Sequence, residues 1–155
     1  MPGVDPYNLD PAFERAVVTM ACSKPRFWGL VGHAVEPELV ALPAARDALL
    51  AARAVARDLG RGPDSLLVVL QRLRRWLEEG KATHEQIVAV SDLFDAAQDA
   101  GLPTEDSAAS EVAPVLRYRM QHEAVKSMID NFAKRGDLAG VASAITKAAA
   151  LGTAS

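Results

Sequence analysis

One amphipathic pattern in the middle of the chain restricts the fold more than any other feature. Between residues 66 and 79, large apolar residues recur at the spacing of one helix face, and charged residues occupy the other face. The apolar positions are Leu66, Val69, Leu70, Leu73, Trp76 and Leu77. A period of 3.6 residues predicts an α-helix with one buried side. Similar patterns follow one another along most of the chain, so we predict an all-α fold.

Composition agrees with closely packed helices. Hydrophobic residues make up 50% of the 155-residue chain, but only 5% of residues are aromatic. Alanine supplies much of the hydrophobic total. Alanine has the best helix propensity and allows helix backbones to approach each other. The length fits one domain, or one domain with a helical appendage.

Capping residues divide the chain into four parts. Asp10 followed by Pro11 is a typical helix start, and later proline and glycine residues separate further helices. The predicted parts are a flexible arm at 1–9, a compact head of about six helices at 10–103, a connector at 104–114 and a C-terminal αα-hairpin at 115–151.

The stretch EEGKATHEQ (78–86) contains a Gly-Lys pair that resembles the end of a phosphate-binding loop. Such a loop needs a glycine five residues before the pair and serine or threonine directly after it, but Arg75 and Ala82 occupy these places. Gly80 instead fits a helix C-cap, and Thr83 with Gln86 fits a capping box. We therefore predict a joint between two helices.

No group of residues predicts catalysis. The single cysteine, Cys22, excludes both a disulfide framework and a cysteine zinc site, and we expect a buried, unreactive thiol. The histidines lack the i, i+4 spacing of a helical metal site, and we expect them in solvent or at helix ends: His33, His84 and His122. We predict a chain that is not an enzyme by itself and that needs no cofactor.

Charge favours no dedicated nucleic-acid binder, because the net charge is −3. Two groups of arginines are nevertheless candidate contacts to phosphate or to an acidic partner, with a solvated surface as the alternative: Arg72, Arg74, Arg75, Arg117 and Arg119. The acidic residues that line up at i, i+3, i+7 are expected to form an exposed face: Asp92, Asp95 and Asp99.

No feature predicts secretion or membrane insertion. The beginning of the chain, MPGVDPYNLD, lacks the apolar core of a secretory signal. No apolar run approaches the roughly 18 residues of a membrane span. We expect a soluble, cytoplasmic protein without a membrane partner.

The apolar face of the predicted hairpin is wider than the pairing of two helices requires. It either meets another chain or packs back on the head, and the sequence leaves both open. The candidate interface residues are Met120, Val125, Met128, Ile129, Phe132, Leu138, Val141 and Ile145.

Four segments follow one another in the order that a known family shares. They are FERAVVTMACSKPRFW (13–28), HAVEPELVALPAARDALLAARAVARDLG (33–60), RGPDSLLVVLQRLRRWLEEGKATHEQI (61–87) and LRYRMQHEAVKSMIDNFAK (116–134). In helix order and punctuation, residues 12–150 resemble the N-terminal domain of DnaB-type replicative helicases.

The resemblance implies a six-helix head with a hairpin and no catalysis. It also implies that hairpins pair between subunits as a dimer or hexamer collar, which helps to dock primase and the helicase loader and meets DNA only indirectly. ATP and Mg²⁺ would belong to a motor domain, and this sequence contains no Walker motif. The alternatives are the helicase-binding domain of a primase, which would stay monomeric, and a regulatory nucleic-acid-binding domain.

Overall fold

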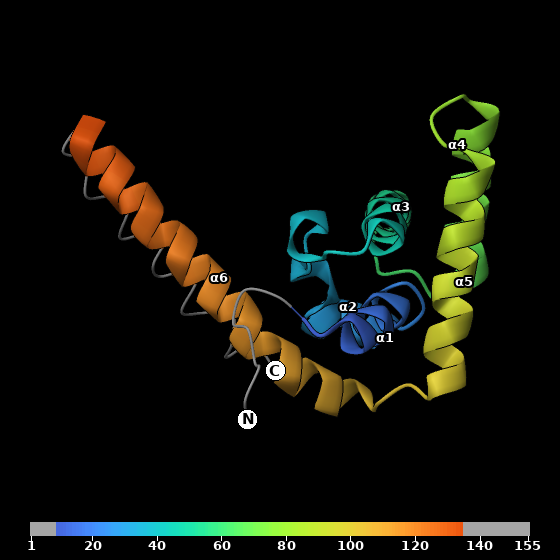
Figure 1. Cartoon of the computed structure of the whole chain (residues 1–155), viewed down its shortest axis with the longest axis horizontal. Helices are drawn as coiled ribbons and strands as arrows, with labels where there is room; N and C mark the ends of the chain where they lie inside the picture. Colours follow the sequence, from blue (N-terminus) through green and yellow to red (C-terminus); the bar gives the residue numbers. More distant parts are fainter. Residues whose placement is uncertain (1–8, 135–155) are drawn as a thin grey trace.

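The computed structural model describes residues 9–134, with side chains up to residue 131. This part of the chain contains six α-helices, two single-turn 3-10 helices and no β-strand, which confirms the all-α class. In chain order they are α1 (Pro11–Ala21), α2 (Pro25–Leu30), η1 (Gly32–Ala34), η2 (Pro37–Leu39), α3 (Pro43–Leu59), α4 (Leu66–Glu78), α5 (His84–Ala100) and α6 (Glu105–Lys134) (Figure 1). The second hairpin arm lies outside the described residues, so the hairpin stays a prediction.

Helices of the head begin where the sequence predicts. The Asp10 carboxylate accepts hydrogen bonds from the backbone N–H groups of Ala12 and Phe13 at 3.2 and 3.4 Å, and Pro11 opens α1. Proline also opens α2, η2 and α3. Because the first N–H groups of a helix have no partner within the helix, a carboxylate cap and a residue without an N–H suit these positions.

The joint between α4 and α5 confirms the prediction made from EEGKATHEQ. Gly80 follows the C-cap with a φ of +74°, a left-handed conformation that favours glycine. Thr83 Oγ1 accepts from the Gln86 N–H at 3.2 Å, and Gln86 Oε1 accepts from the Thr83 N–H at 2.7 Å. This reciprocal pair is a capping box, and the stretch is a turn between two helices.

The core of the head lies where α1, α3 and α5 meet. Phe27, Phe94, Met20 and Leu49 are its largest fully buried apolar side chains. The buried face of α3 that meets them is mostly alanine. Ala45, Ala48, Ala51 and Ala52 all have no exposed surface. Small side chains let neighbouring helices approach closely, so the alanine content of the sequence is used in the centre of the fold.

A buried carboxylate joins α1 to the start of α3. Glu14 is only 1% exposed, and its two oxygens accept from the backbone N–H groups of Ala41 (2.7 Å) and Leu42 (2.9 Å). Leu42 is the N-cap residue of α3 and its side chain makes no capping hydrogen bond. Glu14 therefore acts as a non-local cap, with its negative charge near the positive end of the α3 dipole.

Helix α6 begins ten residues earlier than predicted. Residues 105–114, expected to be a connector, form its first turns, and Thr104 Oγ1 accepts from the Ser107 N–H at 3.2 Å. Pro114 lies inside the helix, where it removes one backbone donor. Burial of Ala108 and Val112 in the core cluster offsets this loss, which explains why the proline does not end the helix.

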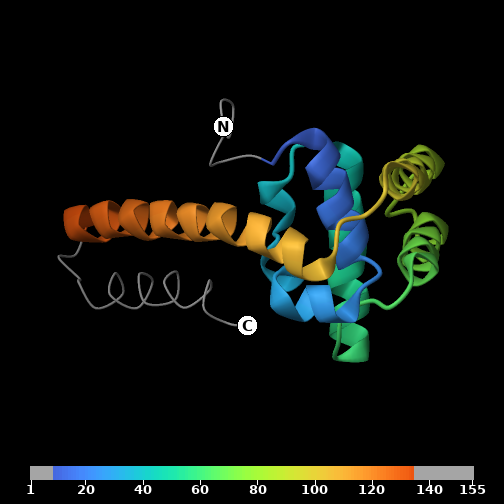
Figure 2. The same ribbon diagram turned by 90° about the horizontal axis from the view of Figure 1, so that it is seen from below.

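The beginning of α6 rests on the head and its remainder projects away from it. Leu116 belongs to the core cluster, and Arg26 of α2 pairs with Asp106 at 2.8 Å and Glu105 at 3.6 Å. Beyond this region α6 continues as a straight helix away from the head (Figures 1 and 2). The head thus fixes one end of α6.

Candidate functional site

The projecting part of α6 carries a row of exposed apolar side chains. Val125, Met128 and Ile129, which we call the docking row, are 47%, 36% and 62% exposed. Their i, i+3, i+4 spacing places them on one helix face. Tyr118, which is 40% exposed, lies closer to the head on the same helix. A contiguous apolar face of this kind is suited to contact with another helix.

The other predicted interface residues divide into two groups. Met120 is half-buried, and it lies between Leu116 and Ala124, which are both buried. The Phe132 side chain lies outside the described part, and so do the residues predicted on the second arm: Leu138, Val141 and Ile145. The structure therefore assigns exposed apolar surface to Val125, Met128 and Ile129 of the predicted set.

The arginines predicted on α4 are largely engaged with acidic neighbours. Arg72 donates to the Asp58 carboxylate and Arg75 Nε lies 3.5 Å from Glu79 Oε1. The hydrogen bond from Arg72, together with its positive charge, lowers the pKa of Asp58. Arg74 is exposed. On α4, pairing thus reduces the charge available for phosphate.

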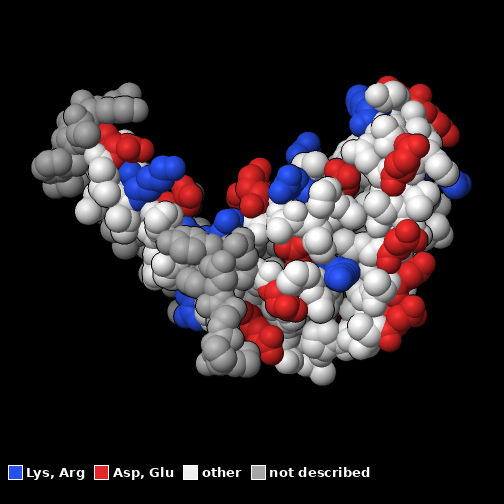
Figure 3. All heavy atoms as spheres, viewed as in Figure 1, with Lys and Arg blue, Asp and Glu red and all other residues white. Residues whose placement is uncertain are grey.

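The arginines predicted on α6 are far from those on α4. Arg119 Nη1 donates to the backbone carbonyl of Glu38 at 3.4 Å, and Arg117 is half-buried. Helix α4 and the projecting part of α6 lie on opposite sides of the head (Figure 1). On the face shown in Figure 3, Lys and Arg are interspersed with Asp and Glu. The five arginines therefore do not form one basic surface.

Cys22 is buried and the acidic residues of α5 are exposed, as the sequence predicts. Cys22 is fully buried, its Sγ lies 3.7 Å from the Ala48 carbonyl oxygen, and burial raises the pKa of its thiol well above the usual range. The three predicted acidic-face residues are exposed on α5: Asp92, Asp95 and Asp99. Within residues 9–131, no three His, Cys, Asp or Glu side chains gather as metal ligands would.

The histidines occupy three separate places. His84 is the first residue of α5 and His122 lies on the projecting part of α6, and both are exposed. His33 is exposed in η1, with its Nδ1 2.8 Å from the Trp28 carbonyl oxygen. Because a carbonyl oxygen can only accept, Nδ1 carries the proton and donates it to Trp28.

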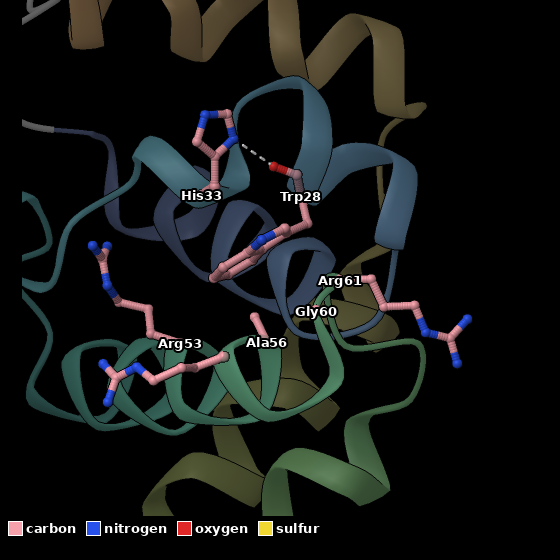
Figure 4. Close-up of a pocket in the computed structure, with 7 residues that line it drawn as sticks. Trp28, His33, Arg53, Ala56, Gly60 and Arg61 are labelled. Carbon is pink, nitrogen blue, oxygen red and sulfur yellow. Dashed lines mark hydrogen bonds between the residues drawn. The ribbon is translucent and has the colours of Figure 1, made fainter.

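Sequence reasoning missed a basic cavity beside that hydrogen bond. Trp28, His33, Arg53, Ala56 and Arg57 line a hollow of about 570 Å³, together with the turn that follows α3. This hollow, which we call the cavity, is wide open to solvent. Figure 4 shows the Trp28 indole between His33 and Ala56, with Arg53 on the same side of α3. Arg61 points away from the indole and its Nη2 lies 3.5 Å from Asp64 Oδ2. The cavity thus combines an aromatic wall with two guanidinium groups.

A glycine allows the turn after α3 to close against Trp28. A Cβ atom at Gly62 would lie 2.4 Å from Cβ and 2.5 Å from Cγ of Trp28, so a larger residue does not fit. Gly62 and Pro63 are both buried. Only glycine, which has no Cβ, allows the backbone to approach another residue this closely. At Gly62 this approach holds the first side-chain atoms of Trp28 in place.

A second hollow of about 510 Å³ lies between the start of α1 and the end of α5. Phe13, Arg15, Ala97 and Glu111 are among the residues that line it. The Nη1 atom of Arg15 is buried without a hydrogen-bond partner in the described part of the chain. This hollow has one guanidinium group beside the carboxylates of Asp10 and Glu111, so it offers an anion less positive charge than the cavity beside Trp28.

Comparison of the chain with known protein families, with curated proteins and with solved structures finds no match in any of the three. Of the helices described, none combines the length and the apolarity needed to cross a membrane.

Proposed function

We propose that this chain is a non-catalytic assembly and docking module, in which α6 of one copy packs against α6 of a second copy. The observation that carries the proposal is the exposure of the docking row on the part of α6 that leaves the head. Burial of exposed apolar surface is favourable. Two copies of one helix can present the same face to each other, so a symmetric pair covers both rows at once.

The dimensions of α6 suit such a pair. Beyond Leu116 the helix extends about 27 Å at about 1.5 Å per residue. Full burial of one side chain such as Ile129 contributes about 1.5–3 kcal/mol, and the partly exposed members of the row contribute less. Stable interfaces bury roughly 1,200–2,000 Å² in total. We therefore expect the docking row to be the centre of a larger contact that includes Tyr118.

The resemblance to DnaB-type N-terminal domains indicates the kind of assembly in which this module would act. In that family the hairpins pair between subunits and form the collar of a ring, which helps to dock primase and the loader. We propose the same kind of role in DNA replication here, with α6 as the first arm of the hairpin. Any contact with DNA would then be made by the assembly and not by this chain alone.

The test is the mass in solution, measured by light scattering from low to high micromolar concentration. We expect dimers or a larger ring. Replacing Ile129 with aspartate would place a charge in the centre of the contact, so the concentration needed for half-assembly should rise at least about tenfold.

Ser127→Asp is the matched control, because it adds the same charge at an exposed position two residues away, nearly opposite on the helix. It should leave assembly unchanged. Circular dichroism should show the same helical content in both variants. A wild-type chain that stays monomeric throughout would contradict the proposal and favour a monomeric docking domain. Loss of helical content in Ile129→Asp would show that this residue supports the fold instead.

A further inference from the structure

The cavity beside Trp28 contains a positive group whose partner is missing. Nη1 of Arg53 is buried and has no hydrogen-bond partner among the described residues. A buried donor without an acceptor is unfavourable, and a guanidinium group is best satisfied by a carboxylate or phosphate. Nη1 has almost no surface of its own, but other atoms of Arg53 line the cavity, and a rotation of the guanidinium group would turn Nη1 toward an oxyanion held there.

Arg57 adds a second guanidinium group one helical turn further along α3. The i, i+4 spacing places both arginines on one face, where they can contact the same anion. The nearest acidic residue in sequence, Asp58, accepts a hydrogen bond from Arg72 of α4. Arg61, the third arginine at the cavity, pairs with Asp64. Arg53 and Arg57 are thus the two arginines of this cavity that the described acidic side chains leave unpaired.

Trp28 provides a flat wall that is already held in place. Its backbone carbonyl accepts from His33, and Gly62 packs against the first atoms of its side chain. The indole itself is only half-buried (Figure 4). An aromatic face fixed in this way can stack a planar ring with little further ordering.

We propose that this cavity binds a phosphate joined to a planar base, with the base stacked on Trp28 and the phosphate held by Arg53 and Arg57. The space of about 570 Å³ is wide open to solvent, so it has room for a ligand of nucleotide size but would cover such a ligand on one side only. A carboxylate side chain of an acidic peptide would satisfy the arginines but would leave the indole face in water. A nucleotide uses both halves of the cavity. The inference does not rest on assembly through α6.

The test is calorimetric titration with AMP, and with inorganic phosphate and adenosine separately. We expect AMP to bind more tightly than either part. The double variant Arg53→Gln/Arg57→Gln should weaken AMP binding at least about tenfold, because two charge-assisted contacts are lost. Trp28→Leu should weaken it by about tenfold or more through the loss of stacking.

Arg74→Gln is the matched control, because it removes an exposed arginine of α4 that lies outside the cavity. It should bind AMP like the wild type. Equal loss in Arg74→Gln and in the double variant would overturn the assignment, and so would undetectable AMP binding by the wild type at millimolar concentration. Phosphate binding as tight as that of AMP would overturn the role of Trp28. Thermal unfolding of each variant checks that the head is intact.

Titration with a short single-stranded oligothymidylate distinguishes a free nucleotide from one unit of a nucleic-acid strand as the ligand. If AMP binds more tightly than the oligonucleotide per site, the ligand is a free nucleotide. If the oligonucleotide binds more tightly and the double variant abolishes its binding, the same cavity holds one unit of a strand. Oligonucleotide binding that the double variant leaves unchanged would place the nucleic-acid site elsewhere and overturn the proposal for a strand.

Discussion

The two parts of α6 have similar apolar spacing but different surroundings. Near its start, Ala108, Val112 and Leu116 are buried against the head. Further along, Val125 and Ile129 are about half exposed or more. Spacing determines which residues share a helix face, but it does not determine what covers that face. The first part is therefore a component of the core, whereas Val125 and Ile129 of the second part lie at the surface.

The largest expected effect on stability comes from an alanine substitution in the buried part of α6, compared with the same kind of substitution in the projecting part. Leu116→Ala should lower the free energy of unfolding by about 2–5 kcal/mol, because it leaves a cavity in the core. Ile129→Ala should change it by no more than about 0.5 kcal/mol in the monomer. Urea unfolding at low protein concentration measures both. Equal losses of unfolding free energy in the two variants would mean that Ile129 is packed into the core as Leu116 is.

A second comparison sets a buried carboxylate of the head against an exposed one on the projecting part. Glu14→Ala should cost about 1–3 kcal/mol, because two backbone N–H groups at the start of α3 lose their acceptor. Glu123→Ala, at an exposed position of α6, should stay within about 0.5 kcal/mol. The same urea experiment tests the pair. Glu14→Gln, which keeps one acceptor oxygen, should lie between these two variants.

The smallest effect concerns the exposed ion pair between α3 and α4. Arg72 lowers the pKa of Asp58 in the folded chain, so the unfolded chain binds the proton more readily. The contribution of Asp58 to stability is therefore fully present above the ordinary carboxyl pKa and is lost as the pH falls through the lower, folded value. Asp58→Asn should remove this part of the pH dependence of thermal unfolding. An unchanged acid slope in the variant would show that the pair contributes nothing in solution.

Local signals were sufficient to predict most helix ends but not the start of α6. Asp10, Gly80 and Thr83 act through neighbours within a few residues, so their roles follow from the sequence. The start of α6 depends on burial of Ala108 and Val112 against distant helices. Polar and alanine-rich residues around Pro114 carry no local sign of that contact, which is why the sequence predicts a connector at residues 104–114.

The basic cavity and the Glu14 cap depend on contacts between distant parts of the chain. Trp28, His33 and Arg53 belong to three elements, and each one taken alone is consistent with an ordinary core or surface residue. The acceptor atoms of Glu14 meet backbone groups 27 and 28 residues away. One signal for Glu14 was available, because it is a carboxylate between the apolar residues Phe13 and Val17 of α1. A charge in such a row indicates a buried polar contact.

The position of Pro114 gives α6 the mechanics of a lever. The helix lacks one backbone hydrogen bond near the place where it leaves the head, so bending is easiest close to this fixed end. Between Pro114 and Lys134 the helix extends about 30 Å, and a rotation of about 10° at the base would move the tip by about 5 Å. A small change at the fulcrum is thus amplified along the arm, and in the proposed assembly it would let the heads of paired copies take different spacings.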